Sequence, residues 1–264
     1  MTVRNNSKID NGQSFVNQRR YILTNHSSFH VQEAYKALRT NIRFFLSGTE
    51  CKKFCITSSA ASEGKSITIL NLAISFAQTG QKVLLIDADM RRPSLARLLI
   101  EKPSPGLSNV LAGLNAEEET IRYSLYENLD VMLSGDLPPN PSELLGSDNM
   151  QKLLERMSKR YDYILVDLPP VGVVSDACVI ANSLDGVLFL VRQNVTDREA
   201  VKYSIKQLEL SGANLMGFVV NGAQNEGKGY SDKYRYSYEM VNNQAPKRRR
   251  PTPKVKGKEK KNEA

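Results

Sequence analysis

Residues 58–66 of this 264-residue chain have the composition of a phosphate-binding loop. Gly64, Lys65 and Ser66 match the end of the G-x-x-x-x-G-K-[ST] pattern, while Ser59 stands where that pattern begins with glycine. In such a loop the glycine lets the backbone approach a phosphate, the lysine reaches the β- and γ-phosphates, and the hydroxyl binds Mg²⁺. A bare GKS string also occurs in surface turns, so its strand-loop-helix setting decides in favour of a nucleotide site.

Three aspartates follow apolar segments later in the chain. Asp87 and Asp89 come at the end of VLLIDAD, and Asp167 ends YILVD. Ligands of open parallel sheets bind beyond the carboxyl ends of the strands, so these side chains are expected beside the phosphate loop. There they can hold Mg²⁺, order its waters or accept a proton. A single aspartate after a strand is as well explained as a helix cap or turn residue, but the set of three favours chemistry.

Short apolar runs alternate with helical patterns along the chain. Such runs without strict alternation indicate a parallel sheet covered on both faces. The sequence therefore predicts an α/β protein, a P-loop NTPase with a mostly parallel, doubly wound sheet. The predicted strands are 53–58, 82–87, 161–167, 186–192 and 215–221, and the predicted helices are 31–45, 66–78 and 197–210. In the first helix Ala34, Leu38, Ile42 and Phe45 form the expected apolar stripe.

The net charge of +8 is concentrated at one end of the chain. Residues 246–264 hold nine Lys/Arg and two Glu, so they carry seven of the eight net charges. A basic tail without interleaved aromatic residues or a reading motif does not indicate a specific nucleic-acid partner. No apolar run of 18 residues and no secretory signal is present, and the three cysteines suit no disulfide framework or zinc spacing.

The chain divides into three predicted parts. Residues 1–30 are interpreted as a flexible arm, 31–225 as the P-loop domain and 226–264 as a disordered tail. Four of the eleven tyrosines lie within nine residues of that tail, at Tyr230, Tyr234, Tyr236 and Tyr238. They are either exposed phosphoacceptors or an aromatic linker.

The aspartate segments also carry a resemblance. VLLIDADMRRP resembles the A-prime Walker motif of bacterial tyrosine kinases, and YILVDLPP resembles their Walker B motif. EAYKALRTNI (33–42), PGLSNVLAG (105–113) and LPPNPSELLGS (137–147) extend the likeness over roughly residues 31–240. The chain is similar to the cytoplasmic kinase subunit of Gram-positive capsule and exopolysaccharide systems. The resemblance implies an ATP-dependent protein-tyrosine autokinase that regulates polysaccharide polymerisation and export.

The resemblance also implies roles for individual residues. Lys65, Asp87, Asp89 and Asp167 would be catalytic, with Asp87 the first choice to orient or deprotonate a tyrosine hydroxyl. Ser66, Asp87 and Asp167 would hold Mg²⁺, and Arg91 or Arg92 either assists or forms surface ion pairs. Asn221 is expected near the adenine base. The ATP-binding set is Ser59, Ala60, Ala61, Ser62, Glu63, Gly64, Lys65, Ser66, Ile67 and Asn221.

The implied partners are a transmembrane activator (the polysaccharide co-polymerase), tyrosine-containing protein substrates, a cognate phosphatase and further copies of the chain in a ring. The expected location is the cytoplasm, with peripheral recruitment to the inner face of the membrane. The family's oligomer motif, Glu-x-x-Arg-x-x-Arg, reads Glu33, Lys36 and Arg39 here. Lysine keeps the charge but loses the planar fork of arginine, so a plain surface charge pattern remains an alternative.

One further departure from the family pattern and two rival functions, a switch ATPase and a scaffold, complete the interpretation. The family usually has Pro-Gly before the loop glutamate, where this chain has Ala61 and Ser62. Septum-positioning and partitioning switch ATPases carry a signature lysine five residues before the loop lysine, and Ala60 stands there. A nucleotide-binding scaffold without turnover is the second rival.

The basic end has several interpretations. It could bind anionic lipid, bind an acidic partner or only keep the tail soluble. Four tail phosphates would add about −6 to −8 charges, which suggests a charge switch as a further hypothesis.

Overall fold

The computed structural model describes residues 18–48 and 51–223. The strands are β1 (Lys52–Ser58), β2 (Val83–Asp87), β3 (Ile121–Tyr123), β4 (Leu129–Met132), β5 (Tyr163–Asp167), β6 (Gly186–Arg192) and β7 (Leu215–Asn221). The helices are α2 (Phe29–Phe45), α3 (Lys65–Ala77), α4 (Leu95–Leu99), α5 (Leu107–Leu111), α6 (Glu117–Thr120), α7 (Pro141–Leu145), α8 (Asp148–Ser158), α9 (Asp176–Ile180), the 3-10 turn η1 (Ala181–Ser183) and α10 (Arg198–Leu210). None of the helices in these ranges is both long and apolar enough to span a bilayer.

The seven strands form one sheet in the order β3-β4-β2-β5-β1-β6-β7. Every neighbouring pair is parallel except β3 with β4, so the prediction of a mostly parallel sheet is confirmed. All five predicted strands and all three predicted helices are present, with ends that differ by no more than two residues. The β3–β4 pair and the short helices between β2 and β6 were not predicted.

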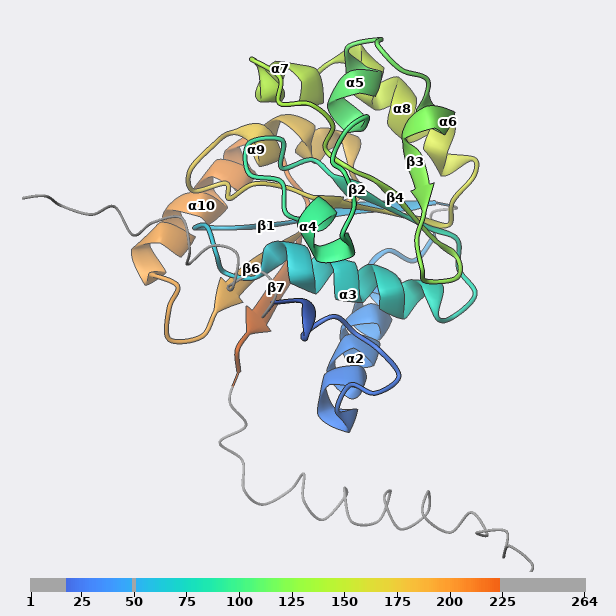
Figure 1. Cartoon of the computed structure of the whole chain (residues 1–264). Helices are drawn as coiled ribbons and strands as arrows, with labels where there is room; N and C mark the ends of the chain where they lie inside the picture. Colours follow the sequence, from blue (N-terminus) through green and yellow to red (C-terminus); the bar gives the residue numbers. More distant parts are fainter. Residues whose placement is uncertain (1–17, 49–50, 224–264) are drawn as a thin grey trace, which may run out of the picture. The chain divides into compact units, whose positions relative to one another are not determined.

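Both faces of the sheet are covered, as the apolar strands require. In β1 the side chains of Phe54 and Ile56 join the core under α3, whereas Cys55 joins the core under α8 and α9. Figure 1 shows α2 and α3 on one side of the sheet and α5, α7 and α8 on the other. Because side chains alternate between the faces of a strand, each buried strand contributes to two separate cores.

The described part of the predicted N-terminal arm is packed. Ile22 and Leu23 are 8% and 3% exposed and belong to the core under α3. The Leu23 amide donates to Asn71 Oδ1 at 2.7 Å, and Asn71 Nδ2 donates to the Tyr21 carbonyl at 2.8 Å. The interpretation of residues 18–30 as a flexible arm is therefore wrong, because two apolar side chains and a buried amide fix them on α3. Residues 1–17 lie outside the described part.

The buried stripe of α2 is rotated relative to the prediction. Leu38 and Ile42 face the protein as expected, and they are accompanied by Tyr35 and Leu46. Ala34 is exposed and Phe45 is 48% exposed, so both assignments to the stripe were wrong. Tyr35 takes this place because its hydroxyl accepts a hydrogen bond from Asn71 Nδ2 at 3.1 Å.

Candidate functional site

The loop between β1 and α3 has the geometry of an anion site. Gly64 caps α3 with φ of +102°, a conformation that side chains rarely adopt. The Thr68 amide donates to the Gly64 carbonyl at 3.1 Å. The amides of Lys65, Ser66 and Ile67 precede this first helical bond and point out of the helix start. A helix beginning with three such donors favours a phosphate there.

Other residues of the predicted ATP-binding set have different places in the loop. The Glu63 carboxylate is buried and accepts hydrogen bonds from the Ser59 hydroxyl and the Ala60 amide, both at 3.1 Å. The Ser59 hydroxyl and the Ala60 amide therefore point at Glu63 and fix the shape of the loop. Ala61 and Ser62 are exposed, and Ser62 has φ of +64°.

Asn221, at the end of β7, packs against the phosphate loop. Its Nδ2 donates to the Glu63 carbonyl at 2.8 Å. A Cβ at Gly64 would lie 2.2 Å from that same nitrogen. The close approach explains why glycine occupies this position, and it gives Asn221 a role in shaping the loop.

Asp87 and Asp167 lie side by side at the carboxyl ends of β2 and β5. The two residues are directly paired in the parallel register, and both are fully buried. Asp87 Oδ2 accepts a hydrogen bond from the Leu95 amide at 3.2 Å. Among the residues that the structure describes, Asp87 Oδ1 and both carboxylate oxygens of Asp167 are buried without a hydrogen-bond partner. A pair of buried carboxylates with three unpaired oxygens is costly, so it is typical of a site that a ligand completes.

The electrostatics of this pair follow from its burial. Burial raises the pKa of Asp167 to about 7, and the nearby Lys65 charge and Ser66 hydroxyl act in the opposite direction. Burial, followed by repulsion from Asp167 and Asp89, holds the pKa of Asp87 well above its usual range. A nearby cation would favour the charged forms of both groups.

These residues fit a magnesium nucleotide. Hard oxygen ligands suit Mg²⁺, and Asp87, Asp167 and the Ser66 hydroxyl offer them beside the helix start. Lys65 is 7% exposed and close enough to Asp167 to affect its pKa, so its charge is directed into the same region. The orphaned carboxylate oxygens are the observation that supports this fit.

Asp89 and the two following arginines are held by local bonds. Asp89 Oδ1 accepts from the Arg92 amide at 3.0 Å. Arg91 grips Asp176 with two hydrogen bonds of 3.0 and 3.1 Å, and the Ser142 hydroxyl donates to the same carboxylate at 2.6 Å. The ion-pair alternative therefore describes Arg91, while the Arg92 side chain is exposed.

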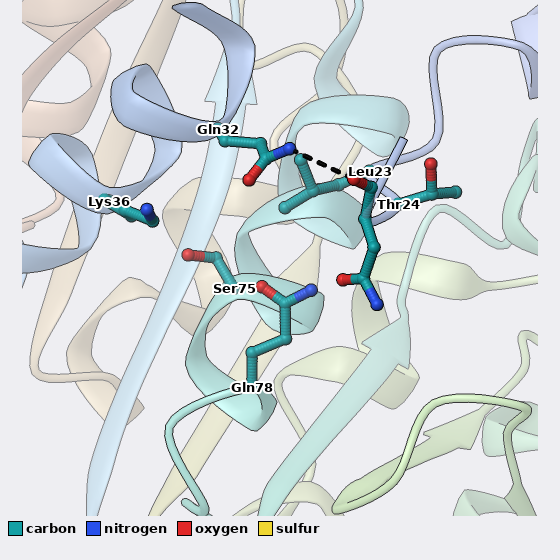
Figure 2. A pocket seen from close by; sticks show the side chains of 7 residues that line it. Leu23, Thr24, Gln32, Lys36, Ser75 and Gln78 are labelled. Carbon is teal, nitrogen blue, oxygen red and sulfur yellow. Dashed lines mark hydrogen bonds between the residues drawn. The ribbon is translucent and has the colours of Figure 1, made fainter. Parts of the chain in front are cut away.

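The predicted oligomer residues make contacts within the chain. Lys36 and Glu33 form an i,i+3 ion pair at 2.8 Å on α2. Arg39 donates to the Ser75 hydroxyl at 3.0 Å and also to the Ser75 carbonyl on α3. Lys36 and Ser75 line a small hollow between α2, α3 and the segment before α2, which Figure 2 shows. Ser75 is ten residues beyond Lys65, or about 15 Å along the helix axis, so this hollow is separate from the phosphate loop.

The predicted phosphoacceptors Tyr230, Tyr234, Tyr236 and Tyr238 lie outside the described residues, as does the basic end. Sequence reasoning missed Arg192, the last residue of β6, and Thr196, which lies just after that strand; both contact the phosphate loop. The Thr196 hydroxyl is 2.5 Å from Glu63 Oε1, and Arg192 Nη1 donates to the Ser62 carbonyl at 3.2 Å. Both residues lie some 130 positions from the loop in the sequence, so no local sequence pattern connects them with it.

The fold and this site define a P-loop nucleotide-binding protein. A family model described as an AAA domain matches residues 52–202. The septum site-determining protein MinD complexed with Mg-ADP, from Pyrococcus horikoshii OT3, aligns with a TM-score of 0.55 at 22% identity over 66% of this chain and 72% of that one. At that identity the likeness shows the fold alone.

Proteins of higher sequence identity show to which family of P-loop proteins the chain belongs. The chain is 38% identical over 190 residues to the tyrosine-protein kinase YwqD of Bacillus subtilis (strain 168), which covers 72% of this chain and 80% of YwqD. It is 38% identical over 202 residues to the tyrosine-protein kinase CpsD of Streptococcus agalactiae serotype III (strain NEM316), covering 76% and 86%. The solved kinase domain of Escherichia coli tyrosine kinase ETK aligns with a TM-score of 0.71 at 38% identity, over 74% and 77%. The chain belongs to the bacterial tyrosine-protein kinase family.

Proposed function

We propose that the chain is an ATP-dependent protein-tyrosine autokinase of the non-specific protein-tyrosine kinase class. The observation that carries this proposal is the pair of buried carboxylates, Asp87 and Asp167, next to Lys65 and Ser66. The relatives named tyrosine-protein kinases, at 38% identity, support the choice of tyrosine as acceptor. Mg-ATP, when bound, supplies the phosphoryl group and the metal charge that neutralises the phosphates.

The residues of this chain divide the work by position. Lys65 and the amides at the start of α3 hold the phosphates, and Ser66 with Asp167 holds the metal. Asp87 orients the tyrosine hydroxyl and accepts its proton as a carboxylate, the form that a nearby cation favours. Asp89, fixed by the Arg92 amide, supports Asp87. Phosphoryl transfer needs mainly positioning and charge neutralisation, which this set provides.

The substrates proposed are the tyrosines of residues 230–238, presented to a neighbouring copy of the chain. The proposed context is regulation of capsule or exopolysaccharide polymerisation and export together with a transmembrane activator. The structure named chimerical protein CapA2B2 aligns with a TM-score of 0.72 at 32% identity, over 76% of this chain and 88% of that one. Because the family resemblance implies a separate activator, the test uses the protein in its own cells.

The test maps phosphotyrosine by mass spectrometry in the wild type and in Lys65→Met, recovered from those cells. Lys82→Met is the matched control, because Lys82 is an exposed lysine that precedes β2 and lies outside the site. We expect phosphate on Tyr230–Tyr238 in the wild type and in Lys82→Met, and its loss in Lys65→Met. Circular dichroism checks that all three proteins are folded.

Two outcomes contradict the proposal. Unchanged phosphate in Lys65→Met assigns the modification to another kinase. An unmodified tail across growth conditions, in a protein that still hydrolyses ATP, favours the switch ATPase. Ala60, in place of that class's signature lysine, argues against this alternative.

A further inference from the structure

The phosphate loop is organised around a buried carboxylate that faces inward. Glu63 is 1% exposed. Its Oε2 accepts from the Ala60 amide at 3.1 Å, and its Oε1 accepts from the Ser59 hydroxyl at 3.1 Å. Within residues 18–48 and 51–223, the third contact, from the Thr196 hydroxyl at 2.5 Å, is the one side-chain bond to this carboxylate that comes from outside the loop. The shape of the loop therefore depends on a residue of another segment.

Thr196 is itself held firmly. Its hydroxyl oxygen accepts from the Arg192 amide at 2.7 Å, so its single proton is free to be donated to Glu63. The next residue, Asp197, caps α10 by accepting from the Ala200 amide at 2.8 Å. Thr196 thus lies between the end of β6 and the start of α10, two elements of fixed position.

The loop backbone needs such support because two of its residues adopt left-handed conformations. Gly64 does so with φ of +102°, which glycine tolerates, but Ser62 does so with φ of +64°. A serine in that region is strained by the clash of its Cβ with the backbone. Side chains from the ends of β6 and β7 hold residues 62 and 63 of the loop. Arg192 Nη1 donates to the Ser62 carbonyl at 3.2 Å, and Asn221 Nδ2 donates to the Glu63 carbonyl at 2.8 Å.

We propose that Thr196 is a positioning residue for the phosphate loop and acts through Glu63. Its hydroxyl fixes the Glu63 carboxylate, which holds the Ser59 hydroxyl and the Ala60 amide. The remaining loop amides are thereby aimed at the phosphates before nucleotide binds. Thr196 does not belong to the phosphate cradle itself. Losing its hydroxyl leaves a buried carboxylate oxygen short of a donor and lets the loop relax, so nucleotide affinity falls.

The test measures Mg-ADP affinity by isothermal titration calorimetry on the full chain. Thr196→Val keeps the shape and removes the hydroxyl, whereas Thr196→Ser keeps the hydroxyl. We expect about 10- to 150-fold weaker binding for Thr196→Val and a change of less than about 2-fold for Thr196→Ser, by the usual strength of a hydrogen bond to a charged group. Thr79→Val is the matched control, because the Thr79 hydroxyl donates to the Phe76 carbonyl at the far end of α3. Its affinity should equal that of the wild type.

A double-mutant cycle with Glu63→Ala separates positioning from a general loss of structure. If Thr196 acts through Glu63, Thr196→Val weakens Mg-ADP binding no further in the Glu63→Ala background. Wild-type affinity in Thr196→Val, or an equal loss in both backgrounds, overturns the proposal. Should Thr196→Val unfold, Thr196→Ala is measured against Thr196→Ser instead. The inference rests on the proposed function only for nucleotide binding, so it stands or fails separately from tyrosine phosphorylation.

Discussion

We expect the stability of Asp167→Asn relative to the wild type, both without ligand, to increase as the pH rises. Asp167 is fully buried, its carboxylate oxygens lack hydrogen-bond partners, and its pKa is raised to about 7. The unfolded chain ionises this group near its usual pKa of 3.8. Between those two values the unfolded state binds fewer protons than the folded state, so the wild type loses stability as the pH rises. Asparagine does not titrate, and its variant escapes this loss.

The size of the effect follows from the same two pKa values. Each pH unit between about 4 and 7 costs the folded wild type about 1.4 kcal/mol from this one group. Between pH 5.5 and 7.5 the cost grows by about 2 kcal/mol, since the dependence levels off near the folded-state pKa. The buried amide of asparagine adds a penalty of its own, but that penalty does not change with pH and cancels in the comparison of the two pH values.

The assay is urea unfolding of wild type and Asp167→Asn at pH 5.5 and 7.5, without nucleotide or metal. We expect the free energy of unfolding of the variant, relative to wild type, to rise by about 2 kcal/mol between the two pH values. Asp176→Asn is the control. Asp176 is equally buried, but Arg91 and Ser142 satisfy its carboxylate. This variant should lose about 1–3 kcal/mol at pH 7.5, because it weakens the charge-assisted hydrogen bonds that the buried carboxylate accepts from the partly exposed Arg91.

Two results would refute the reasoning. A relative stability of Asp167→Asn that changes by less than about 0.5 kcal/mol between the two pH values would mean that burial does not raise this pKa. A loss of stability in Asp176→Asn no larger than in Asp167→Asn would mean that hydrogen-bond satisfaction does not separate the two carboxylates. The first result would also remove the electrostatic reason for placing a cation beside Asp167.

Three further predictions concern other parts of the chain. Gly172→Ala places a Cβ 2.3 Å from the Ser59 carbonyl oxygen, so the phosphate loop must move. Mg-ADP binding should therefore weaken by at least about 10-fold. An unchanged affinity in calorimetry would contradict this prediction. Arg39→Ala removes the bonds to Ser75 and should lower the free energy of unfolding by about 1–2 kcal/mol even in the monomer, measured by urea unfolding at low concentration. Burial raises the pKa of the Cys51 thiol to about 11, so iodoacetamide should modify it more slowly at pH 8 than it does in the urea-unfolded chain, followed by intact mass.

The regular elements were predictable because their apolar patterns are strong. The strands that were missed are short and polar in part, since β3 has three residues and β4 contains Asp130. Helices α4 to α7 and α9 have four or five residues, too few for a periodic pattern, and tertiary contacts hold them. Helix α8 was a real omission, because Met150, Leu153, Leu154 and Met157 form a stripe and Ser147 caps it.

The candidate site was predictable only in part, for a different reason. The acids and the phosphate loop carry local motifs, and the parallel register brings Asp87 and Asp167 together as the sequence predicted. The contacts of Thr196 with Glu63 and of Arg91 with Asp176 join segments that are far apart in the chain. A single sequence shows the residue types of such pairs but not their pairing.

The departures of this loop from the family pattern can be understood together. Where the family usually has Pro-Gly, this chain has Ala61 and Ser62, and Ser62 keeps the left-handed conformation that glycine would adopt without strain. Proline and glycine shape a loop through their own backbone preferences, whereas this loop is shaped from outside by Arg192, Thr196 and Asn221. A loop held by side chains from the ends of β6 and β7 becomes sensitive to any movement of those ends. Its phosphate affinity is therefore coupled to that edge of the sheet, to an extent that the Thr196→Val measurement would quantify.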